Sequence, residues 1–203
     1  MRPVSPPDAV PSRSQIAAVI LAAGSSTRLG HPKQSLILAG ETLLARAIRI
    51  AIEAGLTPVI AVLNDSGLVD PVQRLGALPV LNPDALQGIS TSIHSGIRTA
   101  KSSNASGAVL MTCDQVALTA AHLRALCDQP ATITGSGYAG RTGSPAYFPA
   151  SSFEDLFNLQ GDVGARTLLR HARTIPCEAL SLDIDTEEDL EHARKLIENK
   201  QLP

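Results

Sequence analysis

The sequence has few aromatic residues: two tyrosines, three phenylalanines and no tryptophan among 203 residues. Surfaces that bind nucleic acid usually carry a stripe of basic side chains interleaved with aromatic rings that stack on bases. Here the 17 lysines and arginines are scattered along the chain, and 19 aspartates and glutamates bring the formal net charge to −2. The composition therefore argues against a nucleic-acid-binding surface.

Patterns that hold metals or disulfides are also missing from the sequence. The three cysteines, Cys113, Cys127 and Cys177, contain no C-x-x-C pair, and their odd number does not suit a disulfide framework. The five histidines are dispersed and no H-E-x-x-H motif occurs, so zinc chemistry is not expected. This use of cysteine favours the cytoplasm as the compartment.

No apolar run approaches the roughly 18 residues that indicate a membrane-spanning helix. Hydrophobic residues make up 44% of the chain and charged residues 18%, which is the balance of a globular protein. Residues 1–14 contain four prolines and no apolar core, so we expect a flexible tail rather than a signal peptide or a strand. Residues 15–203 are then expected to form one domain that buries a substantial core.

The most distinctive stretch runs from Ala18 to Gln34. An apolar segment long enough for a buried parallel strand ends in a loop that contains Gly24, Arg28, Gly30 and Lys33. Glycines let the backbone approach a ligand closely, consecutive N–H groups bind anions, and both cations suit phosphate oxygens. The loop matches neither G-x-x-x-x-G-K-[ST] nor G-x-G-x-x-G. It predicts a different kind of polyphosphate site, with an ordinary strand-to-helix loop as the alternative.

Beyond this loop, apolar runs typical of strands alternate with apolar residues at helical spacing. Strands are expected at residues 58–63, 78–81, 107–112, 131–134, 145–148 and 180–184, with a glycine-rich loop at 135–143. Helices are expected at residues 44–52 and 70–75, through Ile93 and Ile97, from Thr119 to Leu126, through Leu168 and Leu169, and after the capping-box pattern at Thr186. This alternation implies an α/β fold whose parallel strands are joined by right-handed crossovers. Ligands of such sheets bind beyond the carboxyl ends of the strands.

Three aspartates follow expected strands at that edge. Asp114 follows the strand at 107–112, where a carboxylate suits a Mg²⁺ ion that also contacts phosphates; a solvated turn aspartate is the alternative. Asp183 and Asp185 lie at the end of the expected strand 180–184 and would share one face of it. We favour Asp185 as the second metal ligand because it is nearer the end of the strand.

Two further segments have a functional and a plain interpretation. Gly88 and Ser90 precede a helix whose N-terminus would face the ligand edge, although a serine-capped helix explains the same residues. Asp162 and Arg166 are four residues apart, a spacing that also suits an ion pair on a helix surface.

Residues 21–34 read L-A-A-G-S-S-T-R-L-G-H-P-K-Q and resemble the signature loop of nucleotidyltransferases of the molybdenum-cofactor cytidylyltransferase type. Residues 87–93, 113–115, 159–166 and 183–190 are similar to further motifs of this family, in the family's order. The resemblance implies a Rossmann-like three-layer sandwich with a mostly parallel sheet, of the nucleotide-diphospho-sugar transferase-like kind. It also implies Mg²⁺-dependent transfer of CMP from CTP to molybdopterin, with release of pyrophosphate.

The resemblance assigns roles to particular residues. The catalytic residues would be Arg28, Lys33 and Asp114. The nucleotide would contact Leu21, Ala22, Ala23, Gly24, Ser25, Ser26, Arg28, Lys33, Gly88, Ser90 and Ser92. The metal ligands would be Asp114 and Asp185. The acceptor would lie near Asp183, Gly143, Pro145, Gly161, Asp162 and Arg166.

Some positions distinguish branches of the family or depart from its pattern. Residues 22–24, Ala-Ala-Gly, resemble the cytidylyl branch, whereas the guanylyl branch usually has a second glycine before the serine. Val116 and Glu187 replace family prolines, and Ser144 replaces a histidine near the second substrate. The implied partners are CTP, molybdopterin and a molybdenum enzyme that receives the product, with no nucleic acid and no membrane.

Three other functions stay open at this point. A cytidylyltransferase for another phosphorylated acceptor, such as methylerythritol phosphate, shares the opening loop, but its H-D-A-A-R-P segment does not match residues 111–115. A nicotinamide-dependent oxidoreductase would need the G-x-G-x-x-G fingerprint and an acidic residue about 20 positions further on, where Ala45 and Arg46 stand. A catalytically silent nucleotide-binding module that serves a molybdenum enzyme would use the same loop.

Overall fold

The structure is a computed structural model that describes residues 15–24 and 31–199. The expected tail at 1–14 lies outside the described residues, and so do Ser25, Ser26 and Arg28 of the predicted phosphate loop. Among the helices of the described part, none has the length and apolar character needed to cross a membrane.

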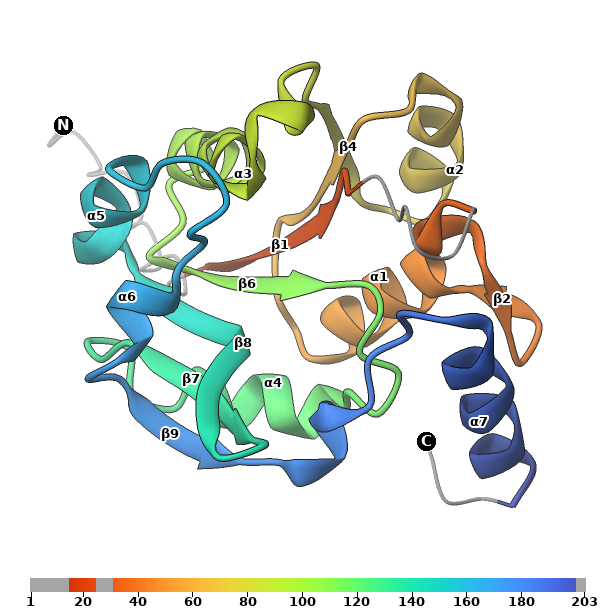
Figure 1. Cartoon of the computed structure of the whole chain (residues 1–203). Coiled ribbons are helices and arrows are strands. Elements are labelled where there is room, and N and C mark those ends of the chain that lie inside the picture. Colours follow the sequence, from red (N-terminus) through yellow and green to blue (C-terminus); the bar gives the residue numbers. More distant parts are fainter. Residues whose placement is uncertain (1–14, 25–30, 200–203) are drawn as a thin grey trace, which may run out of the picture.

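A seven-stranded sheet forms the centre of the structure, in the order β5-β4-β1-β6-β8-β7-β9 (Figure 1). Its strands are β1 (Ile16–Ala22), β4 (Val59–Leu63), β5 (Leu78–Leu81), β6 (Gly107–Thr112), β7 (Thr134–Tyr138), β8 (Arg141–Pro149) and β9 (Arg173–Pro176). Strands β5, β4, β1 and β6 are mutually parallel, β8 is antiparallel to both of its neighbours, and β9 is parallel to β7. A separate hairpin joins β2 (Ile37–Leu38) to β3 (Glu41–Thr42). The expected α/β fold with a mostly parallel sheet is confirmed.

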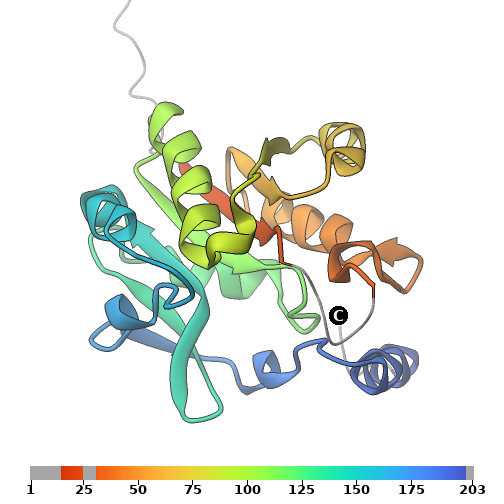
Figure 2. The same cartoon turned by 45° about the horizontal axis from the view of Figure 1, so that its top comes forward.

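Helices cover both faces of the sheet, and Figure 2 shows α3 crossing it. One face packs against α1 (Leu43–Glu53), α2 (Val69–Arg74), α4 (Ala120–Leu126) and α7 (Glu187–Glu198). The other face packs against α3 (Ile89–Ser102), α5 (Phe153–Phe157) and α6 (Arg166–Leu169). Short 3₁₀ turns lie at η1 (Lys33–Ser35), η2 (Ser66–Leu68), η3 (Ala85–Gln87), η4 (Ala150–Ser152) and η5 (Glu178–Ser181). The arrangement is the expected three-layer sandwich.

The alternation of β1 explains how one buried strand serves two cores. Ala18 and Ile20 face the first helical layer, whereas Ala17 and Val19 face the second, because successive side chains of a strand point to opposite faces. The second layer approaches closely: a Cβ atom on Gly96 of α3 would lie 2.2 Å from Cγ1 of Val19. A glycine is therefore required where α3 crosses β1.

Two predicted helix starts are formed as expected. The Thr119 hydroxyl accepts a hydrogen bond from the His122 N–H at 3.2 Å at the start of α4. Thr186 and Asp189 form a reciprocal capping box at the start of α7. Such caps satisfy N–H groups that the helix itself leaves without partners.

The predicted strand at 131–134 and the glycine-rich loop that follows it are wrong. Residues 134–138 form β7, which pairs with β8 across a turn at Ala139 and Gly140, both with positive φ. Two such residues are typical of a tight hairpin turn. Glycine usually weakens a strand, but here a Cβ atom on Gly137 would lie 2.5 Å from the Thr174 side chain. The small residues fit a crowded sheet, which sequence periodicity does not reveal.

The predicted strand at 180–184 is also wrong. Residues 178–181 form η5, and Asp183 makes only an isolated bridge to Gln115. Leu180 and Ile184 are fully buried against the first helical layer, so their apolar character reflects core packing rather than strand pairing. The argument that Asp183 and Asp185 share one face of a strand therefore fails, and their positions must be taken from the structure.

Candidate functional site

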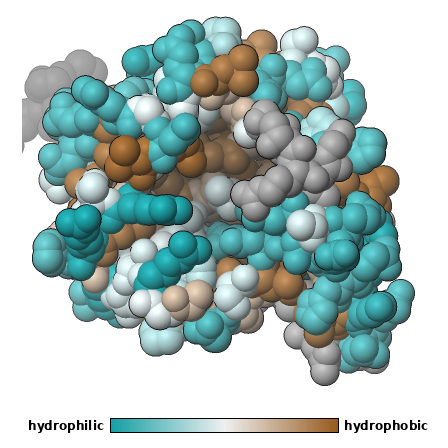
Figure 3. All heavy atoms as spheres, viewed as in Figure 1, coloured by the Kyte–Doolittle hydropathy of each residue, from teal (hydrophilic) through white to brown (hydrophobic). Residues whose placement is uncertain are grey.

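Two adjoining pockets lie at the carboxyl ends of β1 and β6. The first, which we call the β1 pocket, has a volume of about 450 Å³, and the second, the β8 pocket, about 580 Å³. Figure 3 shows a hollow on this face of the molecule, with hydrophobic residues in its depth and hydrophilic ones around it. Residues lining both pockets are Leu21, Ile89, Thr112 and Asp162. Two ligands bound in these pockets would therefore lie side by side.

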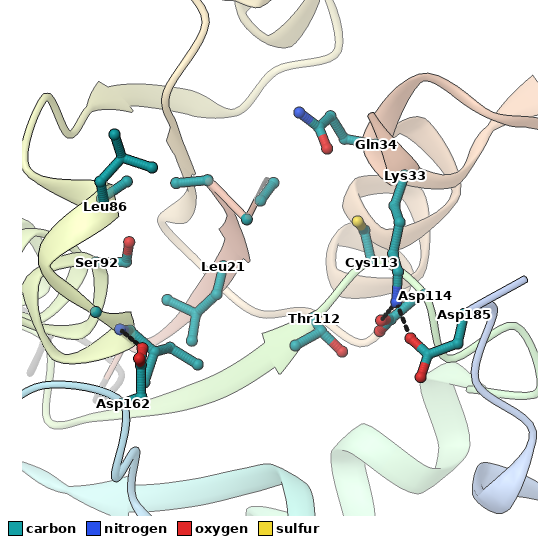
Figure 4. A pocket seen from close by; sticks show the side chains of 16 residues that line it. Leu21, Lys33, Gln34, Leu86, Ser92, Thr112, Cys113, Asp114, Asp162 and Asp185 are labelled. Atoms are coloured by element: carbon teal, nitrogen blue, oxygen red, sulfur yellow. Dashed lines mark hydrogen bonds and ion pairs between the residues drawn. The ribbon is translucent and has the colours of Figure 1, made fainter. Parts of the chain in front are cut away.

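The β1 pocket collects most of the described residues that the sequence assigns to the nucleotide and metal (Figure 4). They are Leu21, Ala22, Ala23, Gly24, Lys33, Gly88, Ser92, Asp114 and Asp185. Ser90, in the first turn of α3, is buried and does not line the pocket. Gln34, which ends the signature loop but to which the resemblance assigns no role, lines this pocket as well. Leu86 and Thr112 also line it, and no sequence pattern singles them out.

Lys33 joins the two predicted metal ligands. Its Nζ donates a hydrogen bond to Asp114 Oδ2 at 3.0 Å and another to Asp185 Oδ1. The Lys33 and Asp114 side chains are 18% and 19% exposed and that of Asp185 is 42% exposed, so the cluster opens to solvent on one side. Burial disfavours the ammonium charge, but the bonds to Asp185 and Asp114 outweigh it and raise the pKa of Lys33. Lys33 is therefore protonated and positively charged near neutral pH.

The donor set around Lys33 suits a divalent cation. Asp114 and Asp185 already converge on one positive charge, and Mg²⁺ typically takes one or two carboxylates together with water and substrate oxygens. Across the described ranges 15–24 and 31–199, no group of three or more histidine, cysteine, aspartate or glutamate side chains is placed to hold a metal. The two carboxylates thus fit a metal that shares its remaining ligands with a bound nucleotide.

Asp183 lies beside this cluster but outside both pockets. Its Oδ1 is buried and has no hydrogen-bond partner among the described residues. Burial, with repulsion from Asp114 and Asp185, raises the pKa of Asp183 to about 6. The carboxyl group of Asp183 therefore lies in the negative field of Asp114 and Asp185.

Cys113 lines the β1 pocket next to Asp114. Its burial, and the neighbouring Asp114 charge, raise the pKa of the thiol to about 12. Because the thiolate is the nucleophilic form, Cys113 is not suited to covalent catalysis.

The start of α3 is held by a segment that lies far away in the sequence. The Ile89 N–H donates to Asp162 Oδ1 at 3.2 Å, and the Ser90 N–H donates to the Gly161 carbonyl at 3.1 Å. The helix N-terminus thus borders the pocket as expected, but its first two N–H groups already have acceptors. No ion pair links Asp162 to Arg166 in the described part of the chain, so the surface-pair interpretation is wrong.

The β8 pocket combines an apolar surface with cationic side chains. Its apolar lining comes from Ile89, Ile93, Leu110, Ala146, Phe148 and Leu169. Arg141, Arg166 and Arg170 also line this pocket, and the guanidinium group of Arg141 lies 5.5 Å from the centre of the Tyr138 ring. A guanidinium group can bind two oxygens of one phosphate at the same time. This pocket therefore suits a phosphate group attached to a less polar molecule.

The predicted acceptor residues divide into two groups. Gly143, Asp162 and Arg166 line the β8 pocket, whereas Pro145 and Gly161 do not. The sequence gives no pattern for Arg141 and Arg170, because they belong to segments that only the β7–β8 hairpin and α6 bring together.

A buried hydrogen-bond group supports the wall of the β8 pocket near Ser144. The Ser144 carbonyl accepts hydrogen bonds from Gln115 Nε2 and from the Tyr138 hydroxyl, each at 2.8 Å. Ser136 donates to the next carbonyl, that of Pro145, at 2.7 Å. These bonds fix the segment in which the family's histidine is replaced by Ser144.

Comparison with known proteins identifies the family. The model of the MobA-like NTP transferase domain matches residues 18–176. Purine catabolism protein PucB of Bacillus subtilis (strain 168) is 32% identical over 195 residues, which cover 87% of this chain and 95% of that protein. A probable molybdenum cofactor guanylyltransferase of Opitutus terrae is 47% identical over 49 residues, or 24% of each chain. These matches confirm the resemblance drawn from the sequence motifs.

Solved structures agree with the sequence matches. The crystal structure of Rv0371c from Mycobacterium tuberculosis H37Rv has a TM-score of 0.74 and 31% identity, covering 90% of this chain and 98% of that one. Another structure of Rv0371c is a complex with manganese, with a TM-score of 0.68, 29% identity and the same coverage. A CMP:2-keto-3-deoxy-manno-octonic acid synthetase complexed with CTP has a TM-score of 0.73 at 15% identity and covers 92% of this chain and 100% of that one. This last likeness concerns the fold alone, and it agrees with the expected three-layer α/β sandwich.

Proposed function

Because the chain belongs to the MobA-like NTP transferase family, we propose that it transfers CMP from CTP to molybdopterin and releases pyrophosphate. The observation that carries this proposal is the pair of adjoining pockets. One contains Lys33 with two carboxylates, and the other is lined by three arginines together with apolar residues. A triphosphate with its metal suits the first pocket, and a phosphate monoester on a ring system suits the second.

The chemistry needs positioning and charge neutralisation more than a general base. A phosphate oxygen of the acceptor attacks the α-phosphorus of CTP and forms a P–O bond, while the bond to the β-phosphate breaks and pyrophosphate leaves. The attacking phosphate is already ionised near neutral pH. Lys33, and Arg28 from outside the described residues, would hold the triphosphate, which is the main contribution that such sites make.

Asp114 and Asp185 are the residues that would hold the divalent metal, for which we propose Mg²⁺. When bound, the metal would neutralise charge on the phosphates. The manganese in the Rv0371c complex belongs to that protein, and it supports the choice of a divalent cation here.

The choice of CTP is supported by residues 22–24, Ala-Ala-Gly, whose members all line the β1 pocket. The choice of molybdopterin is supported by the family and by the phosphate-binding character of the β8 pocket. The relatives do not share one nucleotide: one is named a guanylyltransferase and one is bound to CTP. Nucleotide and acceptor must therefore be tested together.

The test measures pyrophosphate release with CTP, GTP, ATP and UTP, with and without molybdopterin, in the presence of Mg²⁺ or Mn²⁺. We expect release only when CTP, molybdopterin and a divalent cation are all present, and none after chelation. A preference for GTP would overturn the cytidylyl assignment.

Pyrophosphate release with another phosphorylated compound, and not with molybdopterin, would show that this compound is the acceptor. The observation in favour of this alternative is that Ser144, which lines the β8 pocket, replaces a family histidine. CTP binding without release for any acceptor would instead favour a silent nucleotide-binding module. We further propose that the enzyme acts in the cytoplasm and delivers its product to a molybdenum enzyme, which co-purification of the product-loaded protein with such an enzyme would test.

A further inference from the structure

The helix that forms one wall of the β1 pocket has no cap of its own. At the N-cap position of α3 stands Gly88, which has no side chain and whose φ is +118°. The first N–H groups of a helix need acceptors from elsewhere. For α3 these acceptors are Asp162 Oδ1, which binds the Ile89 N–H, and the Gly161 carbonyl, which binds the Ser90 N–H.

The contact between these two segments is made by backbone on backbone. A Cβ atom on Gly88 would lie 2.4 Å from the carbonyl carbon of Gly161, so any side chain at this position would push the segments apart. Gly161 and Gly164 themselves have φ values of +56° and +60°, which let the loop turn back onto the helix. The join is therefore built into the sequence of both segments.

The same join lies between the two pockets. Gly88, Ile89 and Ser92 line the β1 pocket, and the loop that continues from Asp162 through Arg166 lines the β8 pocket. Asp162 itself lines both, and Figure 4 shows its carboxylate on the backbone nitrogen at the start of α3.

We propose that Asp162 is a positioning residue that fixes the acceptor pocket relative to the nucleotide pocket by capping α3. This proposal rests on the proposed function for the meaning of the two pockets. It gives Asp162 a role different from direct contact with the acceptor: its carboxylate acts through the helix start, and the loop that it anchors brings Arg166 to its place.

Asp162→Ala tests the proposal, because it removes the cap and leaves the pocket otherwise open. Loss of an N-cap shifts the equilibrium between the formed and the frayed helix start by about fivefold. We therefore expect the kcat/KM for the acceptor to fall by about five- to tenfold. Asp162→Asn should recover most of that loss, since asparagine caps helices about as well as aspartate does. If asparagine is as poor as alanine, the negative charge contacts a substrate or metal and the proposal is wrong; it is also wrong if alanine has no effect.

A measurement without substrates separates this proposal from the proposed function. Amide hydrogen exchange at Ile89 and Ser90 should become faster in Asp162→Ala and return toward the wild-type rate in Asp162→Asn. Unchanged exchange in Asp162→Ala would overturn the cap, whatever the substrates are. Failure of CTP or molybdopterin to react would overturn the proposed function and leave the exchange result to stand by itself.

Gly88→Ala breaks the same join from the other side without changing Asp162. It should speed exchange at the start of α3, whereas Gly55→Ala should not, although Gly55 also has positive φ (+82°), because a Cβ atom there meets nothing within 4 Å. Unchanged exchange at the start of α3 in Gly88→Ala would contradict the proposal.

Discussion

The β1 pocket and the β8 pocket lie side by side but differ in the charged side chains that line them. In the β1 pocket, two carboxylates converge on Lys33. The β8 pocket is lined by three arginines together with apolar side chains. A triphosphate can enter the first pocket only with cations that offset the carboxylates, whereas a phosphate monoester can bind the arginines of the second directly. The difference suggests a division of labour, with metal-assisted chemistry at one pocket and recognition of the acceptor at the other.

Removing the better-shielded carboxylate of the β1 pocket should have the largest effect. We expect Asp114→Asn to lower kcat by about 100-fold or more, because one charge that organises the transferred phosphate is lost. The KM for the acceptor should change little, since Asp114 does not line the β8 pocket. Steady-state pyrophosphate release checks both values, with Asp155→Asn, an exposed change on α5, as the control. A normal kcat in Asp114→Asn would show that Asp114 does not take part in catalysis.

Arg166 tests the other side of the comparison. Arg166→Gln should raise the KM for the acceptor by about tenfold, the scale of one charge-assisted hydrogen bond, and leave the KM for CTP unchanged. Arg98→Gln is a matched control, because Arg98 is an exposed residue of α3 that lines neither pocket. An equal rise in the KM for CTP would show that the two pockets do not divide the substrates in this way.

Lys33 should weaken metal binding in the absence of nucleotide, because it binds the same two carboxylates as the proposed metal. We expect Lys33→Met to bind Mn²⁺ about fivefold more tightly than the wild type in the absence of nucleotide, while its kcat falls, since the triphosphate loses a ligand. Titration calorimetry measures the affinity, and Lys101→Met serves as the control for loss of one exposed charge. Weaker or unchanged Mn²⁺ binding by Lys33→Met would show that Lys33 does not compete with the metal for Asp114 and Asp185.

The smallest effect is expected at Asp183, which lies outside both pockets. Its folded-state pKa of about 6 lies above the ordinary value of 3.8, so folding favours the protonated form and stability falls as the pH rises from about 4 through 6. Asp183→Asn should therefore raise the free energy of unfolding by about 1 kcal/mol at pH 8, and the gain should vanish below pH 4. Urea unfolding at several pH values measures this, with Asp128→Asn as an exposed control. A gain that does not depend on pH would contradict the shifted pKa.

The parallel half of the sheet could be predicted from the sequence with bounds close to those observed. Strand β5 was expected at its observed residues 78–81 and β6 at 107–112, because both are largely apolar runs. The antiparallel half could not be predicted in the same way. Strand β7 contains Gly135, Ser136 and Gly137, whose place in the sheet depends on close packing against Thr142 and Thr174 rather than on intrinsic preference.

The candidate site divides along the same line. The β1 pocket is lined by residues 21–24, by Lys33 and Gln34, and by Asp114 after β6, so much of it comes from positions close in sequence or from the end of a parallel strand. The acceptor side draws on Arg141, Arg166 and Arg170, from a hairpin and a short helix that no local pattern relates.

The sequence by itself determined the α/β class and the family, and it predicted most of the residues that the structure brings together in the β1 pocket. These properties depend on local patterns, namely apolar periodicity, glycine placement and the motifs around Lys33 and Asp114. Only the tertiary structure decided that Lys33 joins Asp114 to Asp185, that Asp183 stays outside the pockets, and that Asp162 caps α3. These contacts join residues 73 to 152 positions apart, and their partners are chosen by how the layers pack rather than by anything in the neighbouring sequence.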